Sequence, residues 1–183
     1  MTVKEVVLTT AGMVGVGDAV EIYLNGDKSQ GEKECLALLR CFNFIQNELA
    51  LDYFPLVAED VVSTATGKIE YAQLSKSAVR ILSIKDEAGC SVKYKLFPSF
   101  LEGKIGNLTV RYTYTPSEKT ISGDVEASLV VSTRLIAYGV ASEYCFSVGL
   151  YEEGEAWNKK YKDALAGAYA LQPAKVMRSR RWQ

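Results

Sequence analysis

The residues best suited to binding chemistry lie at the C-terminal end of the chain. Residues 173–183 contain no acidic residue, and we identify five of their side chains as candidates for partner binding: Lys175, Arg178, Arg180, Arg181 and Trp182. The planar guanidinium groups of arginine form paired hydrogen bonds and stack on rings, which lysine does less well. Pro173 is expected to end the last helix, so that residues 173–183 form an extended basic tail.

Three interpretations of this tail remain open from the sequence. It can dock in an acidic groove of a partner protein, with Trp182 as the buried anchor. It can contact the phosphates of a nucleic acid through its cations. It can also be a solvated chain end without a partner. Docking to a protein is favoured, because a tryptophan ring is costly to leave in water.

Catalytic chemistry has few candidate residues in this sequence. The chain has no histidine, which removes the commonest general base and the commonest zinc ligand. Glu152, Glu153 and Glu155 cluster, but they do so at the expected start of a helix, where the dipole attracts solvated acids. The glycines of residues 12–17 match no nucleotide-binding loop, and no carboxylate loop of the calcium-binding type is present. We therefore expect no enzyme activity, no catalytic residue, no cofactor and no metal site.

The cysteines and the N-terminus indicate the compartment. Cys35, Cys41, Cys90 and Cys145 lack the close spacing of a metal or redox motif, and three of them fall within apolar patterns. We expect buried, reduced thiols that act as small apolar side chains. The first residues do not resemble a signal peptide, and no apolar run is long enough to span a bilayer. Folding in a cytoplasm and no membrane partner are expected.

The charge of the chain is divided unevenly. The net charge is −1, yet the tail carries four cations and no acid, so the rest of the chain is acidic by several charges. Hydrophobic residues make up 48% and charged residues 23%, as in ordinary globular proteins. With 183 residues, the chain is long enough for one domain with a sizeable core.

Apolar residues at steps of three and four predict helices over about 3–13, 30–53, 125–149 and 154–171. The third of these helices, with Leu129 on its inward face, has so little charge that it must be covered on more than one side. Its short, glycine-marked connection to the last helix predicts that the two pack antiparallel. Residues 18–28 are ambiguous between a strand and another structure.

The helix starts are predicted from their capping residues. Thr2 with Glu5, and Ser29 with Glu32, have the spacing of a capping box. Asp124 is the candidate N-cap of the helix over 125–149.

Between the helices, the apolar period changes from 3.6 to two. Four short strands around Ile69, residues 79–83, 92–96 and 108–114 predict a β insertion over about 67–116, as a small antiparallel sheet with one packed face. The abundant tyrosines fit either a half-buried sheet face or a subunit interface. The predicted fold class is α+β: mainly an α-helical bundle with an inserted small antiparallel β-sheet and an extended C-terminal tail. Residues 1–172 would form a single domain, followed by the tail 173–183.

Three pieces of the chain carry a resemblance to a known family. They are the first helix followed by the long helix that ends at Tyr53-Phe54-Pro55, the run from Leu135 to Leu165 that includes Gly149–Trp157, and the closing Arg180-Arg181-Trp182. Together they cover most of the chain, as a pattern of element types and a few residue choices. In this pattern the chain resembles the head–tail connector (adaptor) proteins of tailed bacteriophages.

The resemblance implies a structural, connector-like virion protein rather than an enzyme. Its copies would form a ring, a dodecamer, beneath the portal protein and above a tail or stopper protein, at the head–tail interface of a virion assembled in the host cytoplasm. The C-terminal segment would reach the portal, which assigns portal docking to the five tail residues named above. DNA would pass through the channel without sequence-specific binding, and an acidic body would not grip it.

Other functions compete with the connector. The chain could be a tail-completion or other phage structural protein, with the same helices packed on different partners. A histidine-free enzyme that uses carboxylates or tyrosine, or a nucleic-acid binder that acts through the tail, is less favoured.

Overall fold

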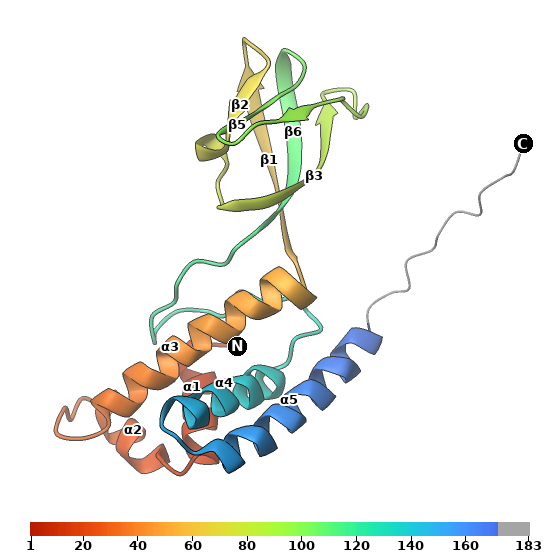
Figure 1. Ribbon diagram of the computed structural model, residues 1–183. Coiled ribbons are helices and arrows are strands. Elements are labelled where there is room, and N and C mark those ends of the chain that lie inside the picture. Colours follow the sequence, from red (N-terminus) through yellow and green to blue (C-terminus); the bar gives the residue numbers. More distant parts are fainter. Residues whose placement is uncertain (172–183) are drawn as a thin grey trace, which may run out of the picture.

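The computed structural model describes residues 1–171, which form a helical bundle with a β lobe projecting from it (Figure 1). The fold class is α+β, as predicted. The bundle contains α1 (Val3–Met13), α2 (Gly17–Leu24), α3 (Glu32–Glu48), the π-helical turn η1 (Leu49–Tyr53), α4 (Thr133–Ser147) and α5 (Tyr151–Ala170). The predicted tail, residues 173–183, lies outside the described residues. Among the residues described, no helix combines the length and the apolar character needed to cross a membrane.

The β lobe, residues 56–114, contains two small antiparallel sheets. In the first sheet, β6 (Gly106–Tyr114) is the middle strand and pairs with β1 (Leu56–Thr64) and β3 (Ala78–Asp86). In the second sheet, β5 (Phe100–Glu102) pairs with β2 (Lys68–Glu70) and β4 (Lys95–Leu96). The short helical turn η2 (Tyr71–Gln73) follows β2.

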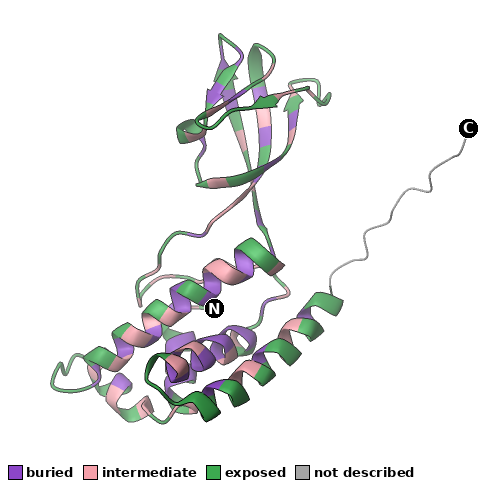
Figure 2. Cartoon of the chain, viewed as in Figure 1, coloured by how far each residue is buried: buried purple, intermediate pink, exposed green. Residues whose placement is uncertain are grey.

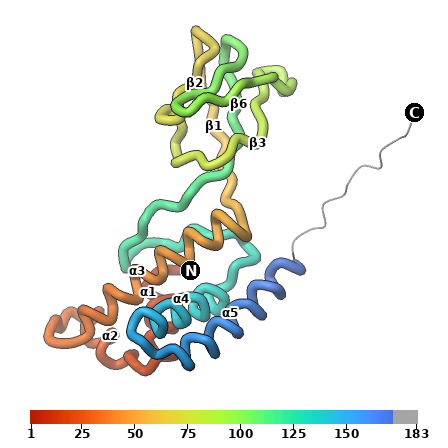
Figure 3. The backbone as a smooth tube through the Cα atoms, viewed as in Figure 1, coloured from red at the N-terminus to blue at the C-terminus, as the bar shows by residue number. Residues whose placement is uncertain are grey.

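The bundle and the lobe have separate hydrophobic cores. The bundle core includes Phe42, Ile45 and Ile136, and the lobe core includes Ile84 and Val110; no residue belongs to both clusters. The chain passes between the two bodies at the start of β1 and again after β6, as the backbone trace shows (Figure 3). The lobe is therefore an insertion in the bundle with a core of its own.

The low-charge helix α4 occupies the middle of the bundle, as its lack of charge predicted. It packs against α1, α3 and α5, and most of its residues are buried (Figure 2). Gly139 allows this close packing, because a Cβ atom there would lie 3.0 Å from side-chain atoms of Ile45 and Tyr161. Ser142 Oγ donates a hydrogen bond to the Gly154 carbonyl oxygen, which joins α4 to α5 in the predicted antiparallel hairpin.

The start of α1 follows the prediction. Thr2 Oγ1 accepts a hydrogen bond from the Glu5 backbone N–H, and the Glu5 carboxylate accepts one from the Thr2 N–H. The predicted capping box at Ser29 and Glu32 is wrong. The N-cap of α3 is Gly31, at φ +80°, and a Cβ atom there would lie 1.9 Å from the Ala19 carbonyl oxygen. A close approach to α2, rather than a side-chain cap, sets this start.

The prediction that a helix begins at 125, with Asp124 as its N-cap, is also wrong. The α4 helix begins at Thr133, and Ser132 caps it through the Leu135 N–H. The preceding segment pairs with the chain start, because the Val3 N–H donates to the Gly123 carbonyl and the Val125 N–H donates to the Met1 carbonyl. Leu129, assigned to the inward helix face, is fully exposed. Backbone pairing with the N-terminus therefore competes successfully with the helix.

Smaller differences concern the other element bounds. Residues 30–53 form α3 and η1, which begin at Glu32 and end at Tyr53 before Pro55, while α5 begins at Tyr151 rather than 154. The ambiguous segment 18–28 is largely the helix α2. The β insertion begins at Leu56 rather than 67. The prediction missed strand β1, because the acidic pair Glu59-Asp60 interrupts its apolar alternation. Strand β5 was not predicted either.

Candidate interaction surfaces

The five predicted docking residues lie outside the described residues, so only the point from which they leave the bundle is known. That point is the end of α5 at Leu171, which is exposed. Two residues earlier, the Tyr169 ring lies against Phe54, with 6.2 Å between the ring centroids. Phe54 joins η1 to β1. The last described residues therefore lie beside the junction of the bundle and the lobe.

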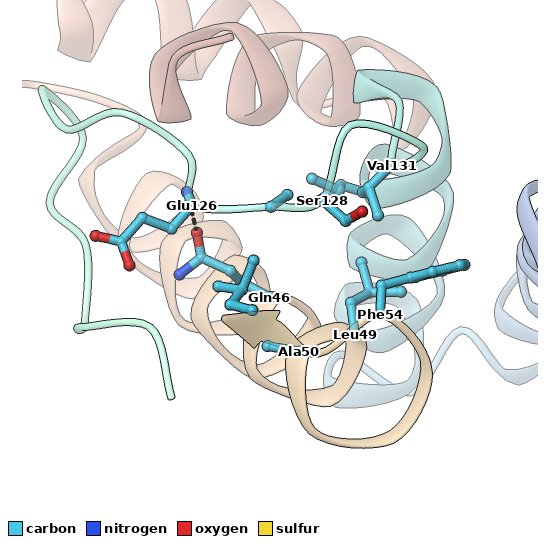
Figure 4. Close-up of a pocket in the computed structure, with 10 residues that line it drawn as sticks. Gln46, Leu49, Ala50, Phe54, Glu126, Ser128 and Val131 are labelled. Carbon is cyan, nitrogen blue, oxygen red and sulfur yellow. Dashed lines mark hydrogen bonds between the residues drawn. The ribbon is translucent and has the colours of Figure 1, made fainter. Parts of the chain in front are cut away.

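A polar clamp holds the returning chain, residues 115–132, on α3. The clamp consists of Asn43, Gln46, Lys119 and Glu126. The Asn43 side-chain amide donates to the Lys119 carbonyl at 3.0 Å and accepts from the Lys119 N–H at 2.7 Å. Gln46 Oε1 accepts from the Glu126 N–H at 3.1 Å (Figure 4). Both amides are buried, and the returning chain supplies the hydrogen-bond partners that buried amides require.

Glu126 extends the clamp to the β lobe through two ion pairs. Its Oε1 atom lies 2.9 Å from Lys119 Nζ and 3.3 Å from Lys76 Nζ, and Lys76 belongs to the lobe. Burial alone would raise the pKa of Glu126, but the hydrogen bonds and charges of the two lysines outweigh it and lower the pKa. The second carboxylate oxygen and Gln46 Nε2 are buried without a hydrogen-bond partner in the described part of the chain. They are an acceptor and a donor within one cluster.

A small crevice adjoins the clamp. Leu49, Ala50, Phe54, Ser128 and Val131 are among its lining residues (Figure 4). Its cavity volume of about 10 Å³ is near the lower limit for a single water. The crevice is a packing gap at the joint and is too small for an organic substrate.

A larger apolar groove crosses the junction on the outer face of the first sheet. We call it the junction groove. Its volume is about 320 Å³, and it is lined by Ala50, Leu51, Pro55, Val57, Val79, Arg80, Leu82, Thr113 and Tyr114. Four of these side chains are large, apolar and 42–53% exposed: Leu51, Val57, Val79 and Leu82. Such a concentration of exposed apolar residues is typical of a surface that binds another chain.

Carboxylates gather around Glu48, at the end of α3. Tyr161 Oη donates to Glu48 Oε1 at 3.4 Å, and Glu48 is half-buried. Burial raises the pKa of Glu48, and the charges of Glu143 and Asp52 add to the increase. Asp52 is exposed and follows the groove residue Leu51 in the chain. The end of α3 is therefore a region of negative potential.

The other candidate residues are not brought together. Glu152, Glu153 and Glu155 are exposed on the first turns of α5, as solvated acids would be. Within residues 1–171, no group of three or more acidic, cysteine or histidine side chains has the geometry to hold a metal ion.

The four cysteines are free. Cys35 and Cys145 are buried and Cys41 is half-buried, with burial raising the pKa of the Cys41 thiol to about 11. Cys90 is exposed, so the expectation of four buried thiols is wrong at this position. It follows the turn at Gly89, where its N–H donates to the Asp86 side chain instead of its thiol entering a core.

Sequence reasoning missed both the clamp and the junction groove. Asn43 and Gln46 follow core residues Phe42 and Ile45 on the apolar face of α3, and this placement of two amides was the available signal. The groove had no signal, because its residues come from η1 and from strand β1, which was not predicted, as well as from β3 and β6. Comparison with known proteins adds no assignment: no protein-family model and no curated protein matches the chain.

Proposed function

We propose that the chain is a structural virion protein that forms a ring with its copies and bridges the portal and the tail of a tailed phage. The tail residues Lys175, Arg178, Arg180, Arg181 and Trp182 would dock on the portal protein. The ring would hold a channel for DNA at the head–tail interface and would contact a tail or stopper protein on its other side. No catalysis, cofactor or metal is part of this role.

The observation that carries the proposal is the order of the elements. Three helices are followed by a β insertion between η1 and α4, and two antiparallel helices then lead directly to the basic end of the chain. This is the arrangement that the connector resemblance implies. The supporting evidence is the architecture together with the closing Arg180-Arg181-Trp182.

Exposed apolar side chains support assembly with other subunits. Val61 on the lobe is 73% exposed, Ile105 is 64% exposed, and Tyr151 at the turn of the α4–α5 hairpin is 68% exposed. The Tyr151 region also contains exposed Val148 and Leu150. Surfaces of this kind fit a protein that buries further area when it joins its neighbours.

Portal capture by tail variants tests the proposal. The portal protein of the same genome is immobilised as an assembled ring, and binding is measured for the full chain and for a chain cut after Gln172. We expect the cut to abolish binding and the substitutions R178Q, R180Q and R181Q together to weaken it at least tenfold, because arginine–acid contacts are lost. The matched control removes three cations elsewhere, K159Q, K160Q and K162Q on exposed positions of α5, and should retain binding.

Three outcomes would contradict the portal role. Equal capture of the cut and full chains would remove the tail from docking. Binding to tail tubes but not to portal rings would favour a tail-completion protein instead. Retention on DNA that falls steeply with salt, with no portal binding, would favour the nucleic-acid binder.

A further inference from the structure

The junction groove has the size and lining of a binding site for a short apolar segment. Leu51 comes from η1, Val57 from β1, and Val79 and Leu82 from β3, so the groove lies between the end of the bundle and the outer face of the sheet. Its volume of about 320 Å³ is within the range of sites that take one large side chain or a small ligand. The only charged residue among those that line it is Arg80.

The chain itself supplies a segment of matching chemistry that starts close by. Tyr169 contacts Phe54, and Phe54 precedes the groove residue Pro55. From Gln172 to Trp182 there are 11 residues, which span at most ~40 Å when extended. That reach is ample, because the segment starts one ring contact away from the groove wall. Val176, Met177 and Trp182 are its large apolar side chains.

The charge around the groove is mixed, because Arg80 lines it while the exposed Asp52 follows the groove residue Leu51. Four cations and no acid lie in residues 173–183, while Glu48, Asp52 and Glu143 concentrate negative charge at the end of α3. Arginines placed beside these carboxylates would gain charge-assisted hydrogen bonds. An acidic or purely apolar peptide would lack this contribution.

We propose that the junction groove binds residues 173–183 of the same chain, with Trp182 among Leu51, Val57, Val79 and Leu82 and the arginines beside the carboxylates at the end of α3. The contact shields the apolar groove and the tryptophan in the free chain. It goes beyond portal docking and does not depend on it. A portal would compete with the groove for the same tail.

Tryptophan fluorescence tests the contact, because Trp157 and Trp182 are the only tryptophans. The substitution W157F leaves Trp182 as the sole reporter and keeps a ring against Tyr138. We expect its emission to be blue-shifted from that of a peptide of residues 172–183, and acrylamide quenching to be several-fold weaker. The added substitution V79K should return both signals to the peptide values, because it removes an apolar contact and repels the basic tail. The control V61K places the same charge on the same sheet at an exposed residue outside the groove and should change neither.

Two results would overturn the contact within one chain. One is a peptide-like emission in the W157F chain. The other is a blue shift that disappears on dilution, because a tail bound to a second copy depends on protein concentration. Hydrogen exchange in the unsubstituted protein gives a second readout: the amides of Val79–Leu82 should exchange several-fold faster after the cut at Gln172, and unchanged exchange contradicts docking. Portal capture is measured separately, so either proposal can fail while the other stands.

Discussion

The helical bundle and the β lobe differ in how they are built and in the charge they carry. The bundle core is closed around the low-charge helix α4, whereas the lobe core is closed between two short sheets. The lobe, residues 56–114, has eight Lys and Arg against six Asp and Glu, while the other described residues have nine against sixteen. The lobe is therefore slightly basic, and the rest of the described chain is acidic.

The two bodies share no core, and polar contacts link the lobe to the bundle through the returning chain. The clamp residues Asn43, Gln46 and Glu126 fix the returning chain, and Lys76 links the lobe to it. Hydrogen bonds weaken steeply away from their preferred distances and angles, so these contacts favour one geometry of the joint. We infer that the clamp sets how the lobe stands on the bundle.

Separate cores predict separate responses to core truncation, and this is the largest expected effect. F42A should lower the free energy of unfolding of the bundle by about 3–5 kcal/mol, and I84A should lower that of the lobe by about 2–5 kcal/mol. Native-state hydrogen exchange would follow amides of α4 and of β6 in each variant. V61A, an exposed position, is the control and should have little effect. Equal losses in both bodies from either core substitution would mean that they unfold as one unit.

The lobe should respond to acid through Asp60. Tyr112 Oη donates to the Asp60 carboxylate at 2.6 Å, and the Ser75 N–H donates to it at 2.7 Å. Burial raises the pKa of Asp60, but these hydrogen bonds outweigh it and lower the pKa. The associated stability is therefore present above the ordinary aspartate pKa and is lost as the pH falls through the lowered value.

The variant D60N should remove this acid dependence from the lobe. It should also cost about 1.5–3 kcal/mol at neutral pH, because hydrogen bonds to a charged acceptor are lost. Denaturant unfolding between neutral pH and pH 3, followed by hydrogen exchange at β6, measures both effects. D163N on exposed α5 is the control. If the lobe of D60N loses stability in acid as the lobe of the unsubstituted protein does, a group other than Asp60 is responsible.

The smallest predicted effect concerns the clamp. N43A should lower stability by ~1–2 kcal/mol, because the Lys119 N–H and carbonyl lose their partner. The exchange of amides in residues 119–126 should accelerate, while the cores of α4 and β6 keep their protection. N47A, one turn further along α3 and outside the clamp, should leave residues 119–126 unchanged. Global rather than local acceleration in N43A would show that the clamp supports the whole bundle.

The extent to which the sequence predicted this fold depends on the range of the interactions. Periodicity located α1, the core face of α3 and the buried middle of α4, because local spacing determines which side chains face inward. It failed at residues 125–132, where the Val125 N–H donates to the Met1 carbonyl and the Glu126 N–H donates to Gln46 instead of a helix forming. It also failed at β1, where Asp60 faces inward and is satisfied by Tyr112 across the sheet. These contacts join residues far apart in the chain, and no local pattern records them.

The same difference between local and long-range information applies to the candidate surfaces. The basic tail was evident from composition alone, since four cations and a tryptophan occur without an acid. The junction groove was not, because Leu51, Val57 and Val79 meet only after the sheet has formed.

The mass of the complex with portal rings tests the central claim most directly. Portal rings of the same genome are mixed with an excess of the 20.1-kDa chain, and the mass of the assembled particle is measured in solution. A connector predicts that the portal gains a fixed number of chains, one for each portal subunit, and that the chain cut after Gln172 adds none. An unchanged portal mass, with the chain remaining at 20.1 kDa even at high concentration, would contradict the connector.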